Sequence, residues 1–285
     1  MNSRNAVLIT PAELAERIHA GGPPAILDVR WRLDVPDGRP AYLDGHIPGA
    51  VYVSLEDELS DHSITGRGRH PLPSGDKLQE ALRRWGVREG VPVVVYDDWN
   101  RAGSGRAWWV LTAAGLPDVR ILDGGWAAWL ASGGAVETGA VDPQSGNVTV
   151  PQQDLYAGSR PTLTAEQAGA GDVPLFDARA KERYTGDSET VDPVGGHIPG
   201  AKNLPFATLL TADGTFLDDA GLARMLSERG IDPAVPVGAY CGSGVTATVV
   251  IAALAAAGHE AALFPGSWSE WSSDPGRPVA RGVES

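Results

Sequence analysis

The sequence contains a single cysteine, Cys241, within the stretch YCGSGVTATVVIAALAAAG at residues 240–258. The preceding AVPVGAYC is a short apolar run typical of a buried strand, and the following TATVVIAALAAAG is rich in helix-forming residues. Gly242 and Gly244 let the backbone fold tightly around the sulfur, and the first turn of the helix offers N–H groups at a positive dipole end. Both features favour a thiolate, so Cys241 is a candidate nucleophile, whereas a lone cysteine is more often only a small buried side chain.

Two chemistries place a cysteine in a cradle of backbone amides: phosphoryl transfer and sulfur transfer. A cysteine phosphatase needs an arginine where Ala247 stands, which makes phosphatase activity a weak alternative. In sulfur transfer, the amides would hold the charged outer sulfur of a persulfide. The candidate substrate-binding residues of the turn are Gly242, Gly244, Val245, Thr246 and Ala247. With one cysteine, neither an internal disulfide nor a multi-cysteine metal site can form, and we expect no cofactor and no metal.

Composition restricts the partners. The chain has 285 residues, with 36 acidic against 23 basic side chains and a formal charge of −13. This excess of negative charge argues against nucleic acid and anionic membranes as partners. No segment approaches the roughly 20 apolar residues of a membrane span, so we expect a cytoplasmic protein.

The elements that position Cys241 are part of an internal repeat. GHIPGAVYVSLEDEL at 45–59 matches GHIPGAKNLPFATLL at 196–210, and ILDVR, VVVYDD and GGWAAW match LFDAR, VGAYCG and GSWSEW in the same order. Asp97 occupies the place of Cys241 in the first copy. Short apolar runs alternate with helical segments such as TPAELAERIHAG, which predicts an α/β fold of two tandem domains, each a mostly parallel sheet flanked by helices. The predicted boundaries are 1–138, a linker at 139–158, and 159–285.

The repeated GHIPGA, the DVR and DAR strand ends, YCGSGVTA and the DGGW and PGSW turns resemble a two-domain rhodanese-family sulfurtransferase over nearly the whole chain. The resemblance implies an inactive first domain and a catalytic second domain. It also implies that Cys241 takes a sulfane sulfur from a small-molecule donor as a persulfide and passes it to cyanide or a thiol. A thioredoxin-like reductant is a candidate protein partner.

The loop CGSGVT is similar to that of mercaptopyruvate-type members, whereas thiosulfate-type members carry CRKGVT with two basic residues. The resemblance therefore favours 3-mercaptopyruvate as the donor, with Ser243 hydrogen-bonding to it. Arg183 in DARAKERY matches the family's substrate arginine, although spacing alone fits a surface salt bridge equally well. GDSETVDPVGGHIPG contains no Arg or Lys where such members carry a second arginine, so thiosulfate remains an alternative donor.

Asp57 and His70, in LEDELSDHSITGRGRHPLP, match positions that act in the family through Ser243 in a relay. Both also fit ordinary polar loop residues. In the same segment, Arg67 and Arg69 would attract anionic donors or stay solvated. A different class of function, a noncatalytic carrier that accepts persulfide sulfur from a partner enzyme, is a further alternative.

Three other groups of residues are interpreted as parts of the fold. Arg179 lies at the DAR strand end and is expected to be structural. His46 and His197 occur in both copies, and so do the tryptophans of the DGGW and PGSW turns. Because only one copy carries the cysteine, residues shared by both copies are expected to support the fold.

Overall fold

The computed structural model describes residues 3–283 and divides the chain into two compact units. The first unit runs to Asp61 and adds Leu72–Arg160 and Thr211–Phe216. The second contains His62–Pro71, Pro161–Leu210 and the chain from Leu217 onward. Each unit thus includes a short segment from the other half of the sequence, and the segment His62–Pro71 carries His70 into the second unit.

The first unit is built on a sheet of 5 strands in the order β1-β5-β4-β2-β3, in which every described pair is parallel. The strands are β1 (Leu8–Ile9), β2 (Ala25–Asp28), β3 (Val51–Tyr52), β4 (Val93–Tyr96) and β5 (Val119–Leu122). The helices are α1 (Ser3–Val7), α2 (Pro11–His19), α3 (Arg39–Asp44), α4 (Leu55–Glu58), α5 (Gly75–Arg84), α6 (Ala102–Ala113), α7 (Gly125–Ala131) and the 3-10 helix η1 (Leu155–Ala157).

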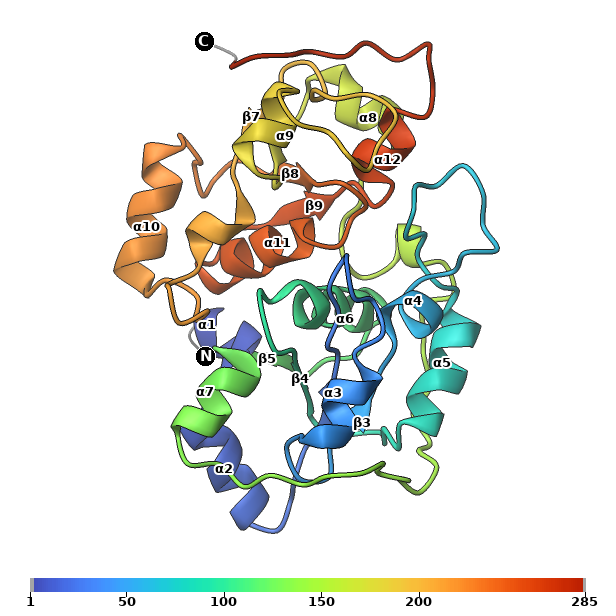
Figure 1. Cartoon of the computed structure of the whole chain (residues 1–285), viewed down its shortest axis with the longest axis vertical. Helices are drawn as coiled ribbons and strands as arrows, with labels where there is room; N and C mark the ends of the chain where they lie inside the picture. The colour runs from blue at the N-terminus through green and yellow to red at the C-terminus, as the bar shows by residue number, and fades with distance from the viewer. Residues whose placement is uncertain (1–2, 284–285) are drawn as a thin grey trace. The chain divides into compact units, whose positions relative to one another are not determined.

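Helices cover both faces of this sheet (Figure 1). Leu14 of α2 and Trp129 of α7 belong to one buried cluster with sheet residues such as Val94. The central helix α6 packs against β4 and β5 and is buried over nearly its whole length. The expected helix after Thr10 is present as α2, where the Thr10 hydroxyl accepts a hydrogen bond from the Glu13 amide in a capping box.

The second unit repeats this plan with a sheet of 4 strands in the order β7-β6-β8-β9, again all parallel. The strands are β6 (Leu175–Asp177), β7 (Lys202–Asn203), β8 (Val237–Tyr240) and β9 (Ala261–Leu263). The helices are α8 (Ala165–Ala170), α9 (Lys181–Thr185), α10 (Asp219–Glu228), α11 (Ala247–Ala256), α12 (Ser267–Trp271) and the 3-10 helix η2 (Phe206–Leu209). A parallel bridge between Thr162 and Leu263 corresponds to the β1–β5 pair of the first unit.

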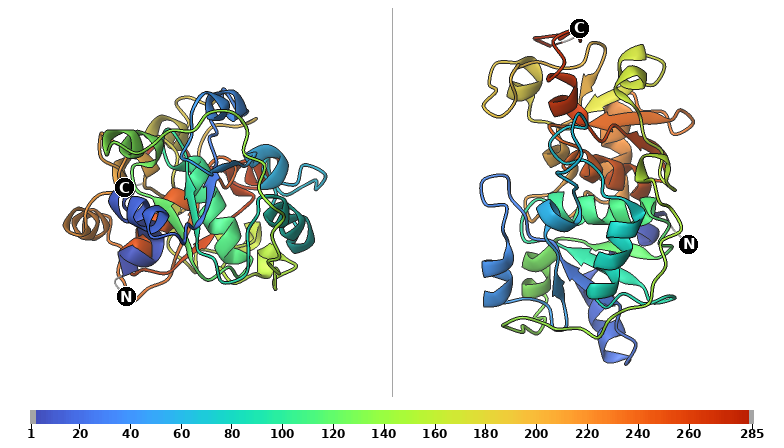
Figure 2. Two further views of the ribbon diagram at one scale, coloured as in Figure 1. Left: turned by 90° about the horizontal axis from the view of Figure 1, so that it is seen from below. Right: turned by 90° about the vertical axis from the view of Figure 1, so that its right-hand side faces the viewer.

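The helices of the second unit also lie on both faces of its sheet. Helix α11 packs against β8 and β9, and α8 and α12 bury Ala168, Trp268 and Trp271 in the core of the other face (Figures 1 and 2). Helix α11 ends before Gly258, whose φ of 83° is the left-handed conformation that glycine adopts freely after a helix. The predicted α/β architecture of two parallel sheets flanked by helices is therefore confirmed.

Residues shared by the two copies hold the same place in each unit. His46 and His197 are fully buried, stack on Tyr42 and Tyr184, and lie 2.9 Å and 2.8 Å through Nδ1 from the carbonyl oxygens of those tyrosines. The buried pair Arg179–Asp177 repeats Arg30–Asp28 at the end of the corresponding strand. These residues support the fold, as the sequence predicts.

Over residues 3–283, no helix is both long and apolar enough to cross a membrane. Within that described part, no three His, Cys, Asp or Glu side chains group in a way that could hold a metal ion.

Candidate active site

Cys241 directly follows β8, at the carboxyl end of the second sheet. Its side chain is buried, and two hydrogen bonds join its backbone to the first two residues of α12. The Cys241 amide donates to Ser267 Oγ over 3.1 Å, and the Cys241 carbonyl accepts from the Trp268 amide over 3.0 Å. The nucleophile candidate therefore sits on a rigid backbone at the end of the sheet where ligands bind in parallel α/β folds.

The turn after Cys241 passes close to the same neighbouring segment. Gly244 has a φ of 75°, and a Cβ atom there would lie 2.3 Å from the Pro265 carbonyl oxygen. Only glycine satisfies both conditions. The amide of Ser269 further donates to the Gly242 carbonyl over 2.8 Å, which is a second contact between the turn and α12.

Several N–H groups of this turn have no acceptor. Within residues 3–283, none of the following amides donates a hydrogen bond to protein: Gly242, Ser243, Val245, Thr246 and Ala247. Unpaired amides beside a buried residue are uncommon because each costs free energy comparable to a lost hydrogen bond. Such a group of amides is a ready site for an anion.

Ser243 contacts a histidine that is distant in sequence. His70 Nδ1 lies 2.7 Å from Ser243 Oγ, and both residues are buried. The segment His62–Pro71 is held in the second unit by the Arg69 amide, which donates to Ser269 Oγ over 3.0 Å. The structure thus brings together the predicted pair His70 and Ser243 beside the cysteine turn.

Arg183 extends from α9 and is one-quarter exposed, at 24%. Its Nη2 donates to Glu189 Oε1 over 2.9 Å and to Asp192 Oδ2 over 3.0 Å, and its Nε donates to Glu189 Oε2 over 3.2 Å. Arg69 also pairs through Nη1 with Asp192. A Cβ atom at Gly242 would lie 3.1 Å from Arg69 Nη2 and 3.4 Å from Arg183 Nη1, so both guanidinium groups flank the turn.

The pKa values of Asp192 and Glu189 shift in opposite directions, because burial and the neighbouring arginines act against each other at both residues. Burial raises the pKa of Asp192, and the Arg69 and Arg183 guanidinium groups only partly offset it. Burial also acts to raise the pKa of Glu189, but hydrogen bonds from Arg183 and from the amides of Val191 and Asp192 outweigh it and lower that pKa. Glu189 is therefore a stable anion, and Asp192 is the carboxylate more easily protonated.

The comparisons with known proteins agree with this geometry. The Rhodanese-like domain family matches residues 10–132 and 161–274, one match in each copy of the repeat. The chain belongs to the rhodanese family. It is 67% identical over 283 residues to SseB of Mycobacterium tuberculosis, which carries a thiosulfate sulfurtransferase name, covering 99% of this chain and 100% of that protein.

The mercaptopyruvate name occurs among the similar sequences and among the similar solved structures. The 3-mercaptopyruvate sulfurtransferase of Escherichia coli K12 is 35% identical, over 84% of each chain. The crystal structure of SseA from Escherichia coli superposes with a TM-score of 0.79 at 31% identity, covering 92% of this chain and 98% of that one. The prediction of a two-domain rhodanese-family sulfurtransferase, similar to the mercaptopyruvate type, is confirmed.

The first rhodanese copy fills its own cradle. Asp97 takes the place of the cysteine, and its Oδ1 accepts from the amides of Trp99 and Arg101 over 3.1 Å and 3.3 Å. Its Oδ2 accepts from the amide and hydroxyl of Ser104 over 2.9 Å and 2.6 Å, and Arg101 Nη2 lies 2.9 Å from Oδ1. A built-in carboxylate therefore occupies the position that an external anion would need.

Asp57 lies in the first unit, in helix α4. Its Oδ2 accepts from Ser54 Oγ over 2.7 Å, and its amide donates back to Ser54 Oγ over 3.2 Å, a local helix-capping arrangement. Asp61, four residues after Asp57, is largely buried, and its Oδ2 lies 2.6 Å from Lys77 Nζ. The role of Asp57 in a relay stays a prediction.

Three residues that contact the site were not predicted from the sequence. Ser267 and Ser269 lie in the short helix α12 and Asp192 lies in a bend after α9, and no spacing rule connects them to Cys241. Ser267 carries one available signal: it replaces Gly125 of the first copy at a left-handed position, with φ of 53° against 55°. A serine in a left-handed conformation where the repeat carries a glycine is strained, and such strain points to a role for its side chain.

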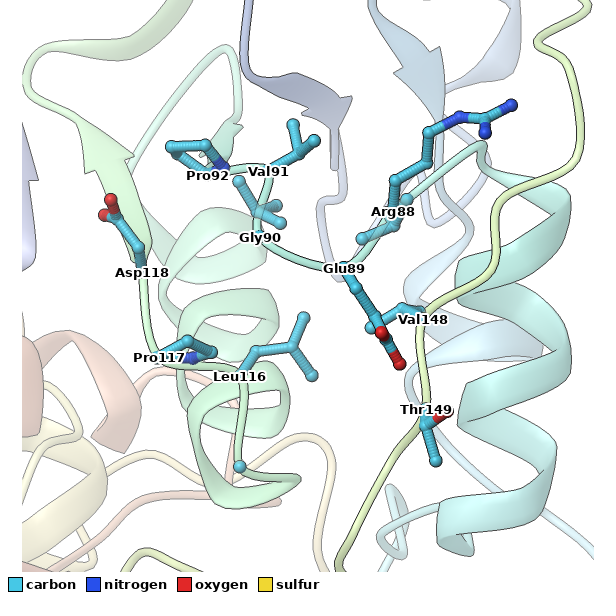
Figure 3. A pocket seen from close by; sticks show the side chains of 13 residues that line it. Arg88, Glu89, Gly90, Val91, Pro92, Leu116, Pro117, Asp118, Val148 and Thr149 are labelled. Atoms are coloured by element: carbon cyan, nitrogen blue, oxygen red, sulfur yellow. The ribbon is translucent and has the colours of Figure 1, made fainter.

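The pocket shown in Figure 3 is in the first unit, at the opposite end of the sheet from Asp97. Val91 and Pro92 precede β4, and Pro117 and Asp118 precede β5, so the pocket lies at the amino ends of these strands. The candidate nucleophile Cys241 instead follows the carboxyl end of β8, in the second unit.

Proposed function

We propose that this protein is a sulfurtransferase that moves a sulfane sulfur from 3-mercaptopyruvate to a thiophilic acceptor through a persulfide on Cys241. The observation that carries the proposal is the turn after β8, where a buried cysteine is followed by amides without a protein acceptor within residues 3–283. The Asp97 carboxylate of the first copy supports it, because the corresponding turn there directs its amides at a negative charge.

In the first half-reaction, the Cys241 thiolate attacks the donor sulfur. A Cys–S bond forms, the carbon–sulfur bond of the donor breaks, and its electron pair passes to the enolate of pyruvate. The S–H proton of the donor then moves to the enolate carbon, which leaves pyruvate and the charged persulfide. The turn amides would stabilise the outer sulfur as an oxyanion hole stabilises oxygen.

Ser243 and His70 would act on the donor carbonyl. If His70 donates its Nδ1 proton across the 2.7 Å contact, the Ser243 hydroxyl is free to donate to the enolate oxygen. Arg183 would bind the donor carboxylate. Asp57 would assist, with His70, in the relay through Ser243 that the family resemblance implies.

In the second half-reaction, cyanide or a thiolate attacks the outer sulfur and the Cys241 thiolate leaves. Since the chain has no other cysteine, the acceptor must come from outside. A thioredoxin-like dithiol is the proposed protein acceptor: it would become a disulfide and release the sulfur as hydrogen sulfide.

Mass spectrometry tests the central step. Protein mixed with excess 3-mercaptopyruvate should gain one sulfur on Cys241, and the Cys241→Ser variant should gain none. An unmodified wild-type protein with both 3-mercaptopyruvate and thiosulfate would refute the persulfide. Slow single turnover with rapid loading would instead indicate a sulfur carrier, and aryl phosphate hydrolysis would indicate a phosphatase.

The donor preference rests on the neutral residues Gly242 and Ser243. The thiosulfate name of SseB supports the alternative donor. We expect kcat/KM to be higher for 3-mercaptopyruvate than for thiosulfate, and the reverse order would assign the protein to the thiosulfate type.

We also propose that residues 1–138 form the noncatalytic domain and 159–285 the catalytic domain, joined by the linker 139–158. A cytoplasmic location is proposed as well, and cell fractionation would test it.

A further inference from the structure

Two arginines from distant parts of the sequence meet at one glycine. Arg69 comes from the segment His62–Pro71 and Arg183 from α9, and the guanidinium groups of both lie beside the Cα of Gly242. The nitrogen atoms nearest to a Cβ built there are Arg69 Nη2 at 3.1 Å and Arg183 Nη1 at 3.4 Å. Two guanidinium groups therefore lie next to the residue that follows the nucleophile.

A shared carboxylate holds the two arginines together. Asp192, whose side chain is 1% exposed, pairs through Oδ1 with Arg69 Nη1 and accepts through Oδ2 from Arg183 Nη2 over 3.0 Å. Glu189 takes the remaining Nε and Nη2 donors of Arg183. The carboxylates thus hold Nη1 of Arg69 and both Nε and Nη2 of Arg183, and the other terminal nitrogen of each guanidinium group lies toward Gly242.

The edges that face Gly242 hold donors that are not used within the described residues. Between residues 3 and 283, neither Arg69 Nη2 nor Arg183 Nη1 donates a hydrogen bond to protein, and these are the guanidinium nitrogens closest to a Cβ built at Gly242. The side chains are 30% and 24% exposed, so a dissolved anion can reach them. Two adjacent guanidinium groups with free N–H donors are well matched to an oxyanion with several oxygens.

We propose that Arg69 and Arg183 together bind the oxyanion group of the sulfur donor, and that Asp192 is the residue that positions Arg69 for this task. The inference rests on the proposed sulfur transfer at Cys241 and defines its substrate class as donors with a carboxylate or a sulfonate. Gly242 keeps the place clear, because any side chain there would press against Arg69 Nη2. The turn itself has no charged side chain, and both guanidinium groups come from other segments of the chain.

Equilibrium binding to the Cys241→Ser protein tests the arginine pair without turnover. In that background, Arg69→Met should raise the Kd of thiosulfate, of 3-mercaptopyruvate or of both by about tenfold or more, because a charge-assisted hydrogen bond is lost. Lys181→Met is the matched control: it removes an equal charge from an exposed site on the helix of Arg183 and should change Kd by less than about twofold.

The two donors identify the oxyanion that is bound. Weaker binding of 3-mercaptopyruvate alone assigns the pair to the carboxylate, and weaker binding of thiosulfate alone assigns it to the sulfonate. If Arg69→Met binds both donors as tightly as Lys181→Met, the proposal is wrong. Because Cys241→Ser cannot form a persulfide, this result is independent of the mass-spectrometric test of sulfur transfer.

The sign of the effect at Asp192 separates positioning from simple charge. Asp192→Ala removes a negative charge, so electrostatics alone predicts tighter binding of an anionic donor. Positioning predicts weaker binding, and an effect of Arg69→Met and Asp192→Ala combined that is smaller than the product of the two single fold-changes. Asp192→Glu should recover part of the affinity. Tighter binding by the Asp192→Ala protein would overturn the positioning role.

Discussion

The hydrogen bond between Ser267 and Cys241 yields a sharp stability prediction, because two substitutions of Ser267 separate its two contributions. Ser267 Oγ accepts from the buried Cys241 amide over 3.1 Å and donates to the Phe264 carbonyl over 2.9 Å. The same residue has a φ of 53°, a left-handed conformation that costs a non-glycine residue roughly 1–2 kcal/mol.

Ser267→Ala keeps the backbone strain and leaves the Cys241 amide without its acceptor. The free energy of unfolding should fall by roughly 1–3 kcal/mol, the usual cost of an unsatisfied buried donor. Ser267→Gly loses the same acceptor but relieves the strain, as Gly125 does in the first copy. The glycine variant should therefore be more stable than the alanine variant by roughly 1–2 kcal/mol.

Urea denaturation measures both differences, provided that the m-values of the proteins agree. Persulfide formation should slow in both variants to a similar extent, because both remove the hydrogen bond between the Cys241 amide and the first residue of α12. Equal stability of the alanine and glycine variants would refute the argument from strain. An alanine variant as stable as the wild type would refute the argument from the hydrogen bond.

Three further predictions concern the neighbouring residues. Ser243→Ala and His70→Phe should each lower kcat/KM by about 5-fold to 150-fold, because each change removes the same buried hydrogen bond. The double variant should lose little more than one of them, and fully multiplicative losses in a double-mutant cycle would contradict this. Gly244→Ala should unfold at a clearly lower temperature than the control Gly221→Ala. A Cβ at Gly244, which has a left-handed φ, would lie 2.3 Å from a backbone oxygen, whereas at Gly221 φ is not left-handed and the nearest atom is a side-chain oxygen 2.9 Å away. Equal melting temperatures of the two variants would argue against this reasoning. The free energy of unfolding of Asp192→Asn should rise relative to that of the wild type as pH increases from about 4. The reason is that the pKa of Asp192 is raised in the folded protein, so its ionised form is unfavourable there. Chemical denaturation across this pH range would show no such trend if the carboxylate titrates normally.

The sequence predicted structural roles for His46, His197 and Arg179, because the chain contains two copies of the same repeat that can be compared with each other. Only the second copy has the cysteine, so a residue that occurs in both copies is expected to support the fold that the two copies share. The burial of both histidines and the repeated Asp–Arg pair bear this out. Alternation of short apolar runs with helical segments was likewise sufficient for the parallel α/β architecture, since strand period and helix period are local properties of the chain.

The contacts around Cys241 were not accessible in the same way. Arg69 carries no sequence signal that separates a donor-binding arginine from a solvated one, and Asp192 lies in a stretch distinguished only by its lack of Arg and Lys. Their partnership depends on the segment His62–Pro71 packing into the second unit, about 120 residues away along the chain from Asp192. Such pairing is set by tertiary packing, for which local propensity and spacing contain no information.

The sequence by itself determined the nucleophile candidate, its turn between a strand and a helix, the doubled α/β plan and the loss of the cysteine in the first copy. Each follows from residue type and local order. Only the tertiary structure decided what surrounds the sulfur: amides without acceptors in one copy and a carboxylate filling the cradle in the other. It also decided that two arginines flank Gly242. Charge at a site is the sum of groups close in space, and the chain brings those groups together only when it folds.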